Sequence, residues 1–143
     1  MYLGIDYGKK RIGLALGTLI PQGIGVIDAE LTPETIYSKI KSICLENDVQ
    51  GIVIGIPIRS QGEDGALVGE IRAFAAALSE MTGLPVHFEE EQFTSAEAER
   101  LLGRVNEKDR KAGKVDELAA VLILEQFLHT SETQKDTEES NKR

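Results

Sequence analysis

Residues 2–16, YLGIDYGKKRIGLAL, place one carboxylate inside a pattern that is otherwise typical of two paired β-strands. The runs 2–8 and 11–17 alternate as strands do, and GKKR between them predicts a hairpin turn. Asp6 lies in the first run, with a glycine two positions away on either side. These three residues share one face of the strand, so Asp6 is predicted to stand on a floor of small residues that is open to a bulky group. A buried carboxylate needs a partner, and the rest of the sequence must supply it.

The elements that follow extend this hairpin into an α/β domain. Further strands are predicted over 22–28, 51–57 and 85–90, and helices over 33–47, 66–81, 94–103 and 115–128. Thr32 is predicted to cap the first helix and Gly83 to end the second. Three strands joined by short turns predict an antiparallel meander, to which the later β-α-β units add parallel strands through right-handed crossovers. The expected fold is a five-stranded mixed sheet flanked by helices, the layout of ribonuclease H-like proteins and of each half of the actin-like ATPases.

Length and composition limit the class of protein. The 143 residues suit one domain, predicted over 1–129, and 41% hydrophobic residues can supply its core. The polar residues 130–143 predict a disordered tail. The single Cys44 excludes an internal disulfide and fits a reducing cytosol. No leader and no membrane-length apolar run is apparent, so we expect a cytoplasmic protein without membrane contact.

The charge pattern is uneven. A formal net charge of −8 taken alone argues against a nucleic-acid binder, but the distribution of charge matters more than its sum. Lys9, Lys10 and Arg11 form one basic cluster, and a second is spread over 104–114. Solvated surface charge explains any one lysine, whereas both clusters together predict basic rims beside an acidic centre.

Acidic residues stand at the ends of three predicted elements. Asp6 lies on the first strand, Glu89–Glu91 end the fifth, and Asp116 opens the last helix. Each has an ordinary explanation: a turn residue, an exposed acidic turn and a helix N-cap, respectively. Taken together they predict a site for Mg²⁺ or Mn²⁺, which prefer carboxylate oxygens and can activate water for phosphodiester cleavage.

Four blocks of sequence carry a family resemblance. They are GIDYGKKRIGLAL at 4–16, GIPIRSQG at 55–62, EEEQFTS at 89–95 and GKVDELAAVLILE at 113–125. In this order and spacing they resemble the YqgF family, also called RuvX, of bacterial pre-16S rRNA nucleases related to Holliday junction resolvases. The resemblance implies a ribonuclease H-like fold, a cytoplasmic location, and metal-dependent phosphodiester hydrolysis at the 5′ end of the 16S rRNA precursor.

The family motifs fall on particular residues. They imply that Asp6, Glu91 and Asp116 are the catalytic residues and the ligands of Mg²⁺ or Mn²⁺. The chain departs from the motif after the fifth strand, where Glu90 replaces an aspartate and Gln92 replaces an arginine. The second replacement removes a charge that could have touched phosphate. We therefore expect the three principal acids to be kept and the substrate contacts to differ in detail.

Basic residues near these blocks are the expected contacts to nucleic acid. They are Lys9, Lys10, Arg11, Arg59, Lys111 and Lys114. The preferred partner is pre-rRNA, with branched DNA as the alternative. The protein is expected to be a monomer or a homodimer, and paired cuts in a four-way junction would need the dimer.

Two hypotheses from other classes stay open on the sequence alone. The D-x-G hairpin with its basic turn also suits phosphate binding in actin-like nucleotide binders, although those use two such domains. The replacements at Glu90 and Gln92 leave room for an RNA-binding ribosome-assembly factor without catalysis.

Overall fold

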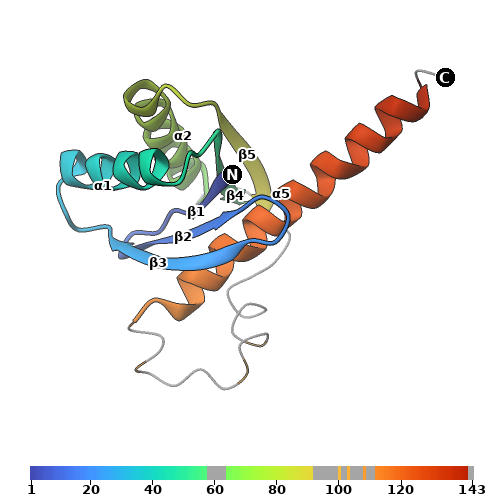
Figure 1. The fold of residues 1–143 in the computed structure, drawn as a ribbon. Coiled ribbons are helices and arrows are strands. Elements are labelled where there is room, and N and C mark those ends of the chain that lie inside the picture. The colour runs from blue at the N-terminus through green and yellow to red at the C-terminus, as the bar shows by residue number, and fades with distance from the viewer. Residues whose placement is uncertain (58–63, 92–99, 101–102, 104–107, 109–111, 142–143) are drawn as a thin grey trace.

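The computed structural model describes residues 1–57, 64–91, 100, 103, 108 and 112–141, of which 131–141 are described by their backbone alone. Its elements appear in the order β1 (Tyr2–Asp6), β2 (Arg11–Gly17), β3 (Gln22–Asp28), α1 (Pro33–Glu46), β4 (Gly51–Pro57), α2 (Asp64–Thr82), β5 (Val86–Glu91) and α5 (Lys114–Asn141) (Figure 1). The predicted helix over 94–103 lies almost entirely outside the described residues.

The five strands form one mixed sheet in the order β3-β2-β1-β4-β5. β2 pairs antiparallel with both β1 and β3, while β4 pairs parallel with β1 and β5. The carboxyl ends of β1, β4 and β5 therefore meet at one edge of the sheet. The predicted mixed sheet is confirmed.

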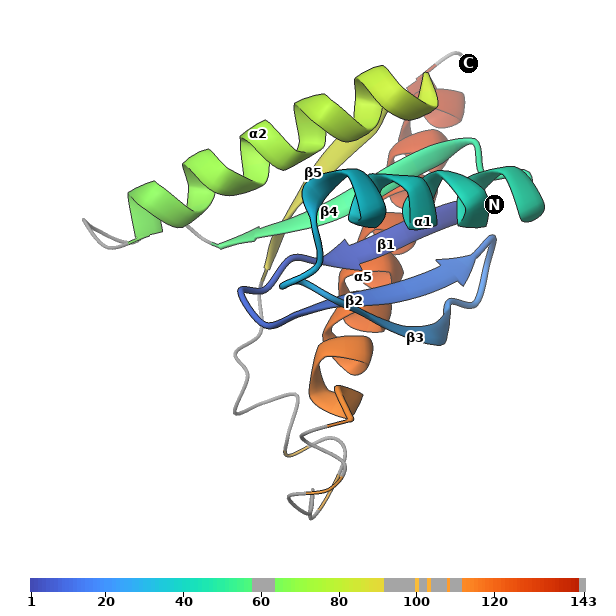
Figure 2. The ribbon, with the colours of Figure 1, turned by 90° about the vertical axis from the view of Figure 1, so that its left-hand side faces the viewer.

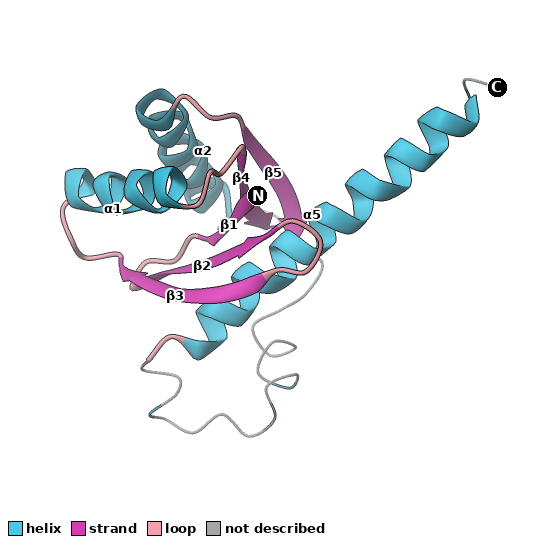
Figure 3. Cartoon of the chain, viewed as in Figure 1, coloured by secondary structure: helices cyan, strands magenta, loops and turns pink. Residues whose placement is uncertain are grey.

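Helices cover both faces of the sheet. α1 and α2 lie side by side on one face and α5 crosses the other, as Figures 2 and 3 show. The larger core lies under α1 and α2 and consists mainly of Ile and Leu side chains; Ile5, Ile40 and Ile54 in it are fully buried. A smaller core lies under α5 and includes Ala15, Val53 and Leu124. Strand alternation, which sends Ile54 to one face and Val53 to the other, produces this division.

Local sequence signals determine where α1 begins and where α2 ends. The Thr32 side chain accepts a hydrogen bond from the Thr35 N–H and Pro33 opens α1, which confirms the predicted cap. Gly83 follows α2 with a φ of 73°, a conformation that glycine adopts without strain. Both helices therefore begin or end where the cap chemistry predicts.

The last helix is longer than predicted. The sequence predicted its end near residue 128 and a disordered tail over 130–143, whereas α5 continues to Asn141. The Glu, Gln and Lys residues of this segment are good helix formers, and extending an existing helix avoids the cost of nucleation. The division into a 1–129 domain and a tail stays a prediction, but the backbone over 130–141 is helical rather than irregular.

No helix in the part of the chain that the structure describes is both long enough and apolar enough to cross a lipid bilayer.

Candidate functional site

The three predicted acids come from elements that converge at the carboxyl edge of the sheet. Asp6 is the last residue of β1 and Glu91 the last of β5, with β4 between these two parallel strands. Asp116 lies in the first turn of α5, which packs across β1 and β2. The sequence separates these residues widely, and the sheet topology brings them together.

Asp6 and Glu91 form a partly buried carboxyl pair. Burial raises the pKa of Asp6 from 3.8 to about 7, and the charges of Glu91 and Asp116 and a hydrogen bond with Glu91 add to the rise. Burial also raises the pKa of Glu91, while its hydrogen bond with Asp6 acts in the opposite direction. The two carboxyl groups therefore titrate as a coupled pair, in which Asp6 keeps its proton to a higher pH than an ordinary aspartate does.

Gly55 of β4 gives Glu91 its path to Asp6. A Cβ built on Gly55 would lie 2.8 Å from Glu91 Oε1 and 2.4 Å from Cδ1 of Ile123. The Glu91 side chain therefore passes over a position where any side chain would obstruct it. The glycine inside the otherwise β-branched run GIVIGIP was the sequence signal for this close approach.

Asp116 is held by an arginine from the hairpin. Arg11 Nε donates a hydrogen bond to Asp116 Oδ2 at 2.9 Å, and both side chains are mostly buried, with 29% and 26% of their surface exposed. Because α5 begins at Lys114, Asp116 lies in the first turn, so the alternative explanation of Asp116 as an N-cap does not hold. A negative charge there is favoured by the helix dipole, and Arg11 fixes its direction.

The small residues beside Asp6 make room for α5, which corrects a sequence-based expectation. A Cβ on Gly13 would lie 1.9 Å from the backbone oxygen of Asp116, and one on Gly4 would lie 2.8 Å from Cβ of Leu124. The floor of small residues was expected to be open to a bulky group, and the group that occupies it is the helix itself. The close packing places the first turn of α5, with Asp116, directly over the hairpin.

The side chains present suit a hard divalent cation by their chemistry. Asp6 and Glu91 offer carboxylate oxygens whose repulsion a bound cation would offset, and Asp116 lies within electrostatic range of Asp6. Among the residues that the structure describes, however, no three His, Cys, Asp or Glu side chains are arranged to hold one ion. Two converging carboxylates and a third engaged by Arg11 are what the geometry provides, so the predicted three-ligand set stays a prediction.

The other two glutamates of β5, Glu89 and Glu90, do not take part in the acid pair. Gln126 of α5 donates from Nε2 to Glu89 Oε1 at 2.8 Å and to the backbone oxygen of Glu90 at 2.6 Å. The Glu90 side chain is exposed. Glu89 therefore ties β5 to α5, and only Glu91 reaches the acid pair.

The predicted nucleic-acid contacts fall into three groups. Lys9 and Lys10 are exposed in the turn at the carboxyl edge, close in sequence to Asp6. Arg11 commits its Nε to Asp116, and Lys114 is exposed with its Nζ 3.7 Å from Glu117 Oε1. Arg59 and Lys111 lie outside the described residues. Contact of these six residues with nucleic acid stays a prediction.

Comparisons with known proteins agree with one another. The family model described as "RuvX: Holliday junction resolvase" matches residues 1–130. A "Putative pre-16S rRNA nuclease" of Koribacter versatilis (strain Ellin345) is 38% identical over 130 residues, covering 88% of this chain and 84% of the relative. A protein of the same name from Chlamydia trachomatis serovar L2 is 42% identical over 134 residues, covering 89% of this chain and 90% of the relative.

A solved structure supports the fold. The chain is similar to "T. thermophilus RuvC in complex with Holliday junction substrate", with a TM-score of 0.56 and 14% identity over 95% of this chain and 96% of that one. A second Thermus thermophilus RuvC structure gives a TM-score of 0.52 at 15% identity, covering 91% of this chain and 96% of that one. These likenesses show a RuvC-like, ribonuclease H-like architecture. The match of the family model over residues 1–130, together with the relatives at 38% and 42% identity, shows that the chain belongs to the RuvX family.

Proposed function

We propose that this protein is a metal-dependent endonuclease that hydrolyses phosphodiester bonds of structured RNA, with the 5′ leader of the 16S rRNA precursor as its substrate. The observation that carries the proposal is the convergence of Asp6 and Glu91 at one edge of the sheet, where burial and the charges of Glu91 and Asp116 raise the pKa of Asp6. The names of the relatives support the choice of substrate. We place the activity in the cytoplasm, as the free Cys44 suggests.

In this proposal each acid has a distinct task. Asp6 and Glu91 would hold Mg²⁺ or Mn²⁺, and Asp116 would complete the set. The chemistry supplied by the bound metal is activation of the attacking water and stabilisation of the leaving oxygen. A cation held there would favour the charged form of Asp6, because opposite charge lowers the pKa of a carboxyl group. Arg11 would hold the Asp116 carboxylate in a fixed position through the hydrogen bond from its Nε.

The basic turn completes the proposed site on the substrate side. Lys9 and Lys10 are exposed in the turn that follows Asp6, and their ammonium groups would bind the phosphates that flank the scissile bond. Positive charge here also offsets the repulsion between an acidic protein and a polyanion. The basic turn would therefore bind the substrate, and the three acids would support its hydrolysis.

The test is cleavage of a pre-rRNA 5′-leader substrate in Mg²⁺ or Mn²⁺ by the full chain and by Asp6→Asn. The variant is expected to lose at least a hundredfold in rate, while Glu46→Gln, an exposed carboxylate on α1, should cleave normally. Equal cleavage by wild type and Asp6→Asn would contradict the role of Asp6. Specific RNA binding without turnover by the wild type would instead favour an assembly factor without catalysis.

Branched DNA is the second candidate substrate, favoured by the family description as a Holliday junction resolvase. The same acids would then act on four-way junctions, and paired cuts need two active sites. Measurement of the protein's mass in solution distinguishes the two candidate substrates. A strict monomer that cuts RNA has only one active site and therefore could not make paired cuts in a four-way junction.

A further inference from the structure

A second concave site opens on the opposite face of the sheet from the acids. It is a pocket of about 300 Å³ between the end of β1, the start of α1 and the first half of α2. Tyr7 lines it, and Tyr7 directly follows Asp6. Because successive residues of a strand point to opposite faces, the pocket and the acid pair lie on the two sides of one strand end.

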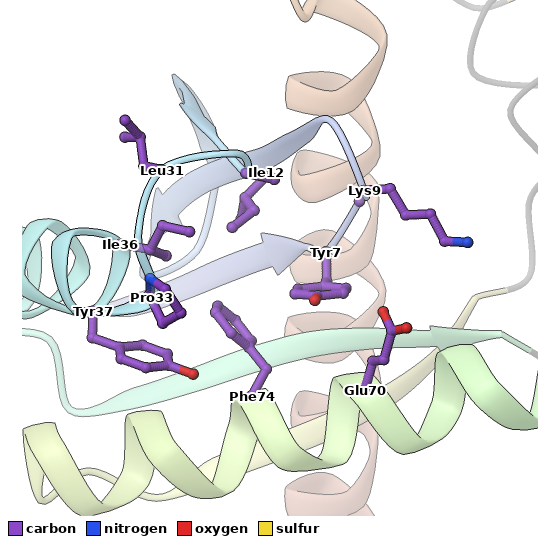
Figure 4. Close-up of a pocket in the computed structure, with 11 residues that line it drawn as sticks. Tyr7, Lys9, Ile12, Leu31, Pro33, Ile36, Tyr37, Glu70 and Phe74 are labelled. Atoms are coloured by element: carbon purple, nitrogen blue, oxygen red, sulfur yellow. The ribbon is translucent and has the colours of Figure 1, made fainter.

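Aromatic rings form the wall of this pocket (Figure 4). The rings of Tyr7 and Phe74 lie 4.9 Å apart between centroids, and those of Tyr37 and Phe74 lie 5.7 Å apart. Phe74 is 5% exposed, whereas both tyrosines are partly exposed. Ile12 and Ile36 supply an apolar floor. The rings are tilted against one another, by 48° for Tyr7 and Phe74 and 36° for Tyr37 and Phe74, so each tyrosine offers its own partly exposed ring to a planar ligand.

Two charged groups stand at the rim of the pocket. Figure 4 shows the carboxylate of Glu70 directed toward Tyr7, and the Lys9 side chain extending outward from the turn. A carboxylate accepts hydrogen bonds from an amino group, and an ammonium group binds a phosphate. Flat apolar walls, one acceptor and one outlying cation together match a nucleotide whose base enters and whose phosphate stays outside.

We propose that this pocket binds an unpaired base of the RNA substrate, stacked on the tyrosines, with Glu70 accepting from the exocyclic amino group. RNA-binding proteins commonly stack splayed bases on aromatic side chains and read their edges by hydrogen bonds. Adenine, cytosine and guanine carry such an amino group, whereas uracil offers a carboxylate only its ring N3–H, so we expect the pocket to bind uracil more weakly. The proposal rests on the proposed function, since it assigns the base a place next to the phosphate under attack.

The site would explain how the enzyme selects its cleavage position. Lys9 belongs both to the pocket and to the turn that follows Asp6, so one strand of RNA can contact the acids and the pocket around a single strand end. A base held in the pocket fixes which phosphate reaches Asp6. Only an unpaired nucleotide can do this, because a base within a duplex is not free to enter.

The first experiment measures binding without catalysis. Adenosine 5′-monophosphate is titrated into the full chain in EDTA, and NMR follows the methyl groups of Ile12 and Ile36. Saturable shifts are expected with this nucleotide, weaker ones with uridine 5′-monophosphate, and none at these methyl groups with ribose 5-phosphate. Equal shifts from ribose 5-phosphate, or no shifts from any probe, would overturn the proposal.

Variants separate stacking from hydrogen bonding. Tyr37→Leu keeps an apolar side chain and should weaken adenosine 5′-monophosphate binding about tenfold, because the stacking surface is lost. Glu70→Gln should remove the preference over uridine 5′-monophosphate. The matched control is Glu80→Gln, an exposed carboxylate elsewhere on α2, which should bind as wild type does. An unchanged base preference in Glu70→Gln would contradict the assignment, even if Tyr37→Leu failed to fold.

These measurements distinguish failure of the pocket proposal from failure of the proposed nuclease function. Nucleotide binding in the pocket by a protein that never cleaves RNA would remove the proposed function and leave the pocket standing. Cleavage by a wild-type protein that shows no nucleotide binding would do the reverse.

Discussion

The two faces of the sheet differ in what they bury. Under α1 and α2 the sheet carries large aliphatic side chains, and the core includes no charged residue among those the structure describes. Under α5 the residues near the acids are glycine and alanine, and a carboxyl pair lies at the end of the strands. The face under α1 and α2 therefore stabilises the fold through apolar burial. The face under α5 has small side chains and neighbouring carboxylates instead, which lets Asp116 lie close to Asp6.

The largest expected effect belongs to the aliphatic face. Ile54→Ala removes a fully buried side chain and should lower the free energy of unfolding by about 2–5 kcal/mol. The loss should be the same at pH 5 and pH 8, because no charge lies in this core. Urea denaturation at both pH values measures it. A loss that changes strongly with pH would show that the two faces are not independent.

Tight packing on the α5 face is tested by Gly13→Ala. Its Cβ would overlap the backbone oxygen of Asp116, so α5 must shift and the cost should be about 3 kcal/mol. Gly69→Ala on α2 is the matched control, since a Cβ there meets nothing within 4 Å and should stabilise the helix by up to about 1 kcal/mol. If both substitutions had equal effects in urea denaturation, the close approach of α5 would be wrong.

Burial of the Asp6 carboxylate, together with charge repulsion from Glu91 and Asp116, predicts that Asp6→Asn is more stable than wild type at pH 8. The unfolded chain loses the Asp6 proton near pH 3.8 and the folded chain near pH 7, so wild-type stability falls as the pH rises through this interval and stays low above it. The upper limit of the gain is about 4 kcal/mol, from 1.36 kcal/mol per pKa unit.

Thermal denaturation from pH 4 to pH 8, in EDTA, measures this effect. Wild type and Asp6→Asn should be similarly stable near pH 4 and diverge toward pH 8. Asp28→Asn, an exposed carboxylate at the end of β3, controls for loss of one negative charge. A variant less stable than wild type at pH 8 would mean that Asp6 is stabilised by its surroundings rather than strained.

The smallest expected effect concerns the support of Asp116. Arg11→Met keeps the apolar stem but removes the partner of a partly buried carboxylate, at a cost of about 1–2 kcal/mol in stability. Cleavage should fall about tenfold because Asp116 loses its orientation. Lys114→Met, which removes an exposed pair with Glu117, should change stability by less than about 0.5 kcal/mol. Equal effects of both variants on stability, or unchanged cleavage by Arg11→Met, would remove the positioning role of Arg11.

The sequence predicted the architecture well because its signals are local. Alternation, caps and turn residues act over a few positions, which is why the bounds of β2, β3 and β4 and the cap at Thr32 are confirmed. The end of α5 was not predicted, because a polar composition alone does not distinguish an irregular tail from an extended helix. Propensity is a weak signal when no apolar face accompanies it.

The site was predicted less completely because its contacts are long-range. The acids could be chosen from their places at element ends and from a family resemblance. The bond between Arg11 and Asp116 spans 105 positions in sequence, and no local pattern encodes it. The glycines of β1 and β2 could be recognised in the sequence. Whether they face solvent, a ligand or a helix depends on where α5 packs against the sheet, which the sequence does not show.

The most direct test of the account is a carboxyl ¹³C titration of Asp6 in the full chain, with and without Mg²⁺. We predict that Asp6 titrates near pH 7 in EDTA, as the buried pair with Glu91 requires, and at lower pH once Mg²⁺ is added. Titration near the ordinary value of 3.8, unchanged by Mg²⁺, would contradict both the strained acid pair and its proposed role in holding the metal.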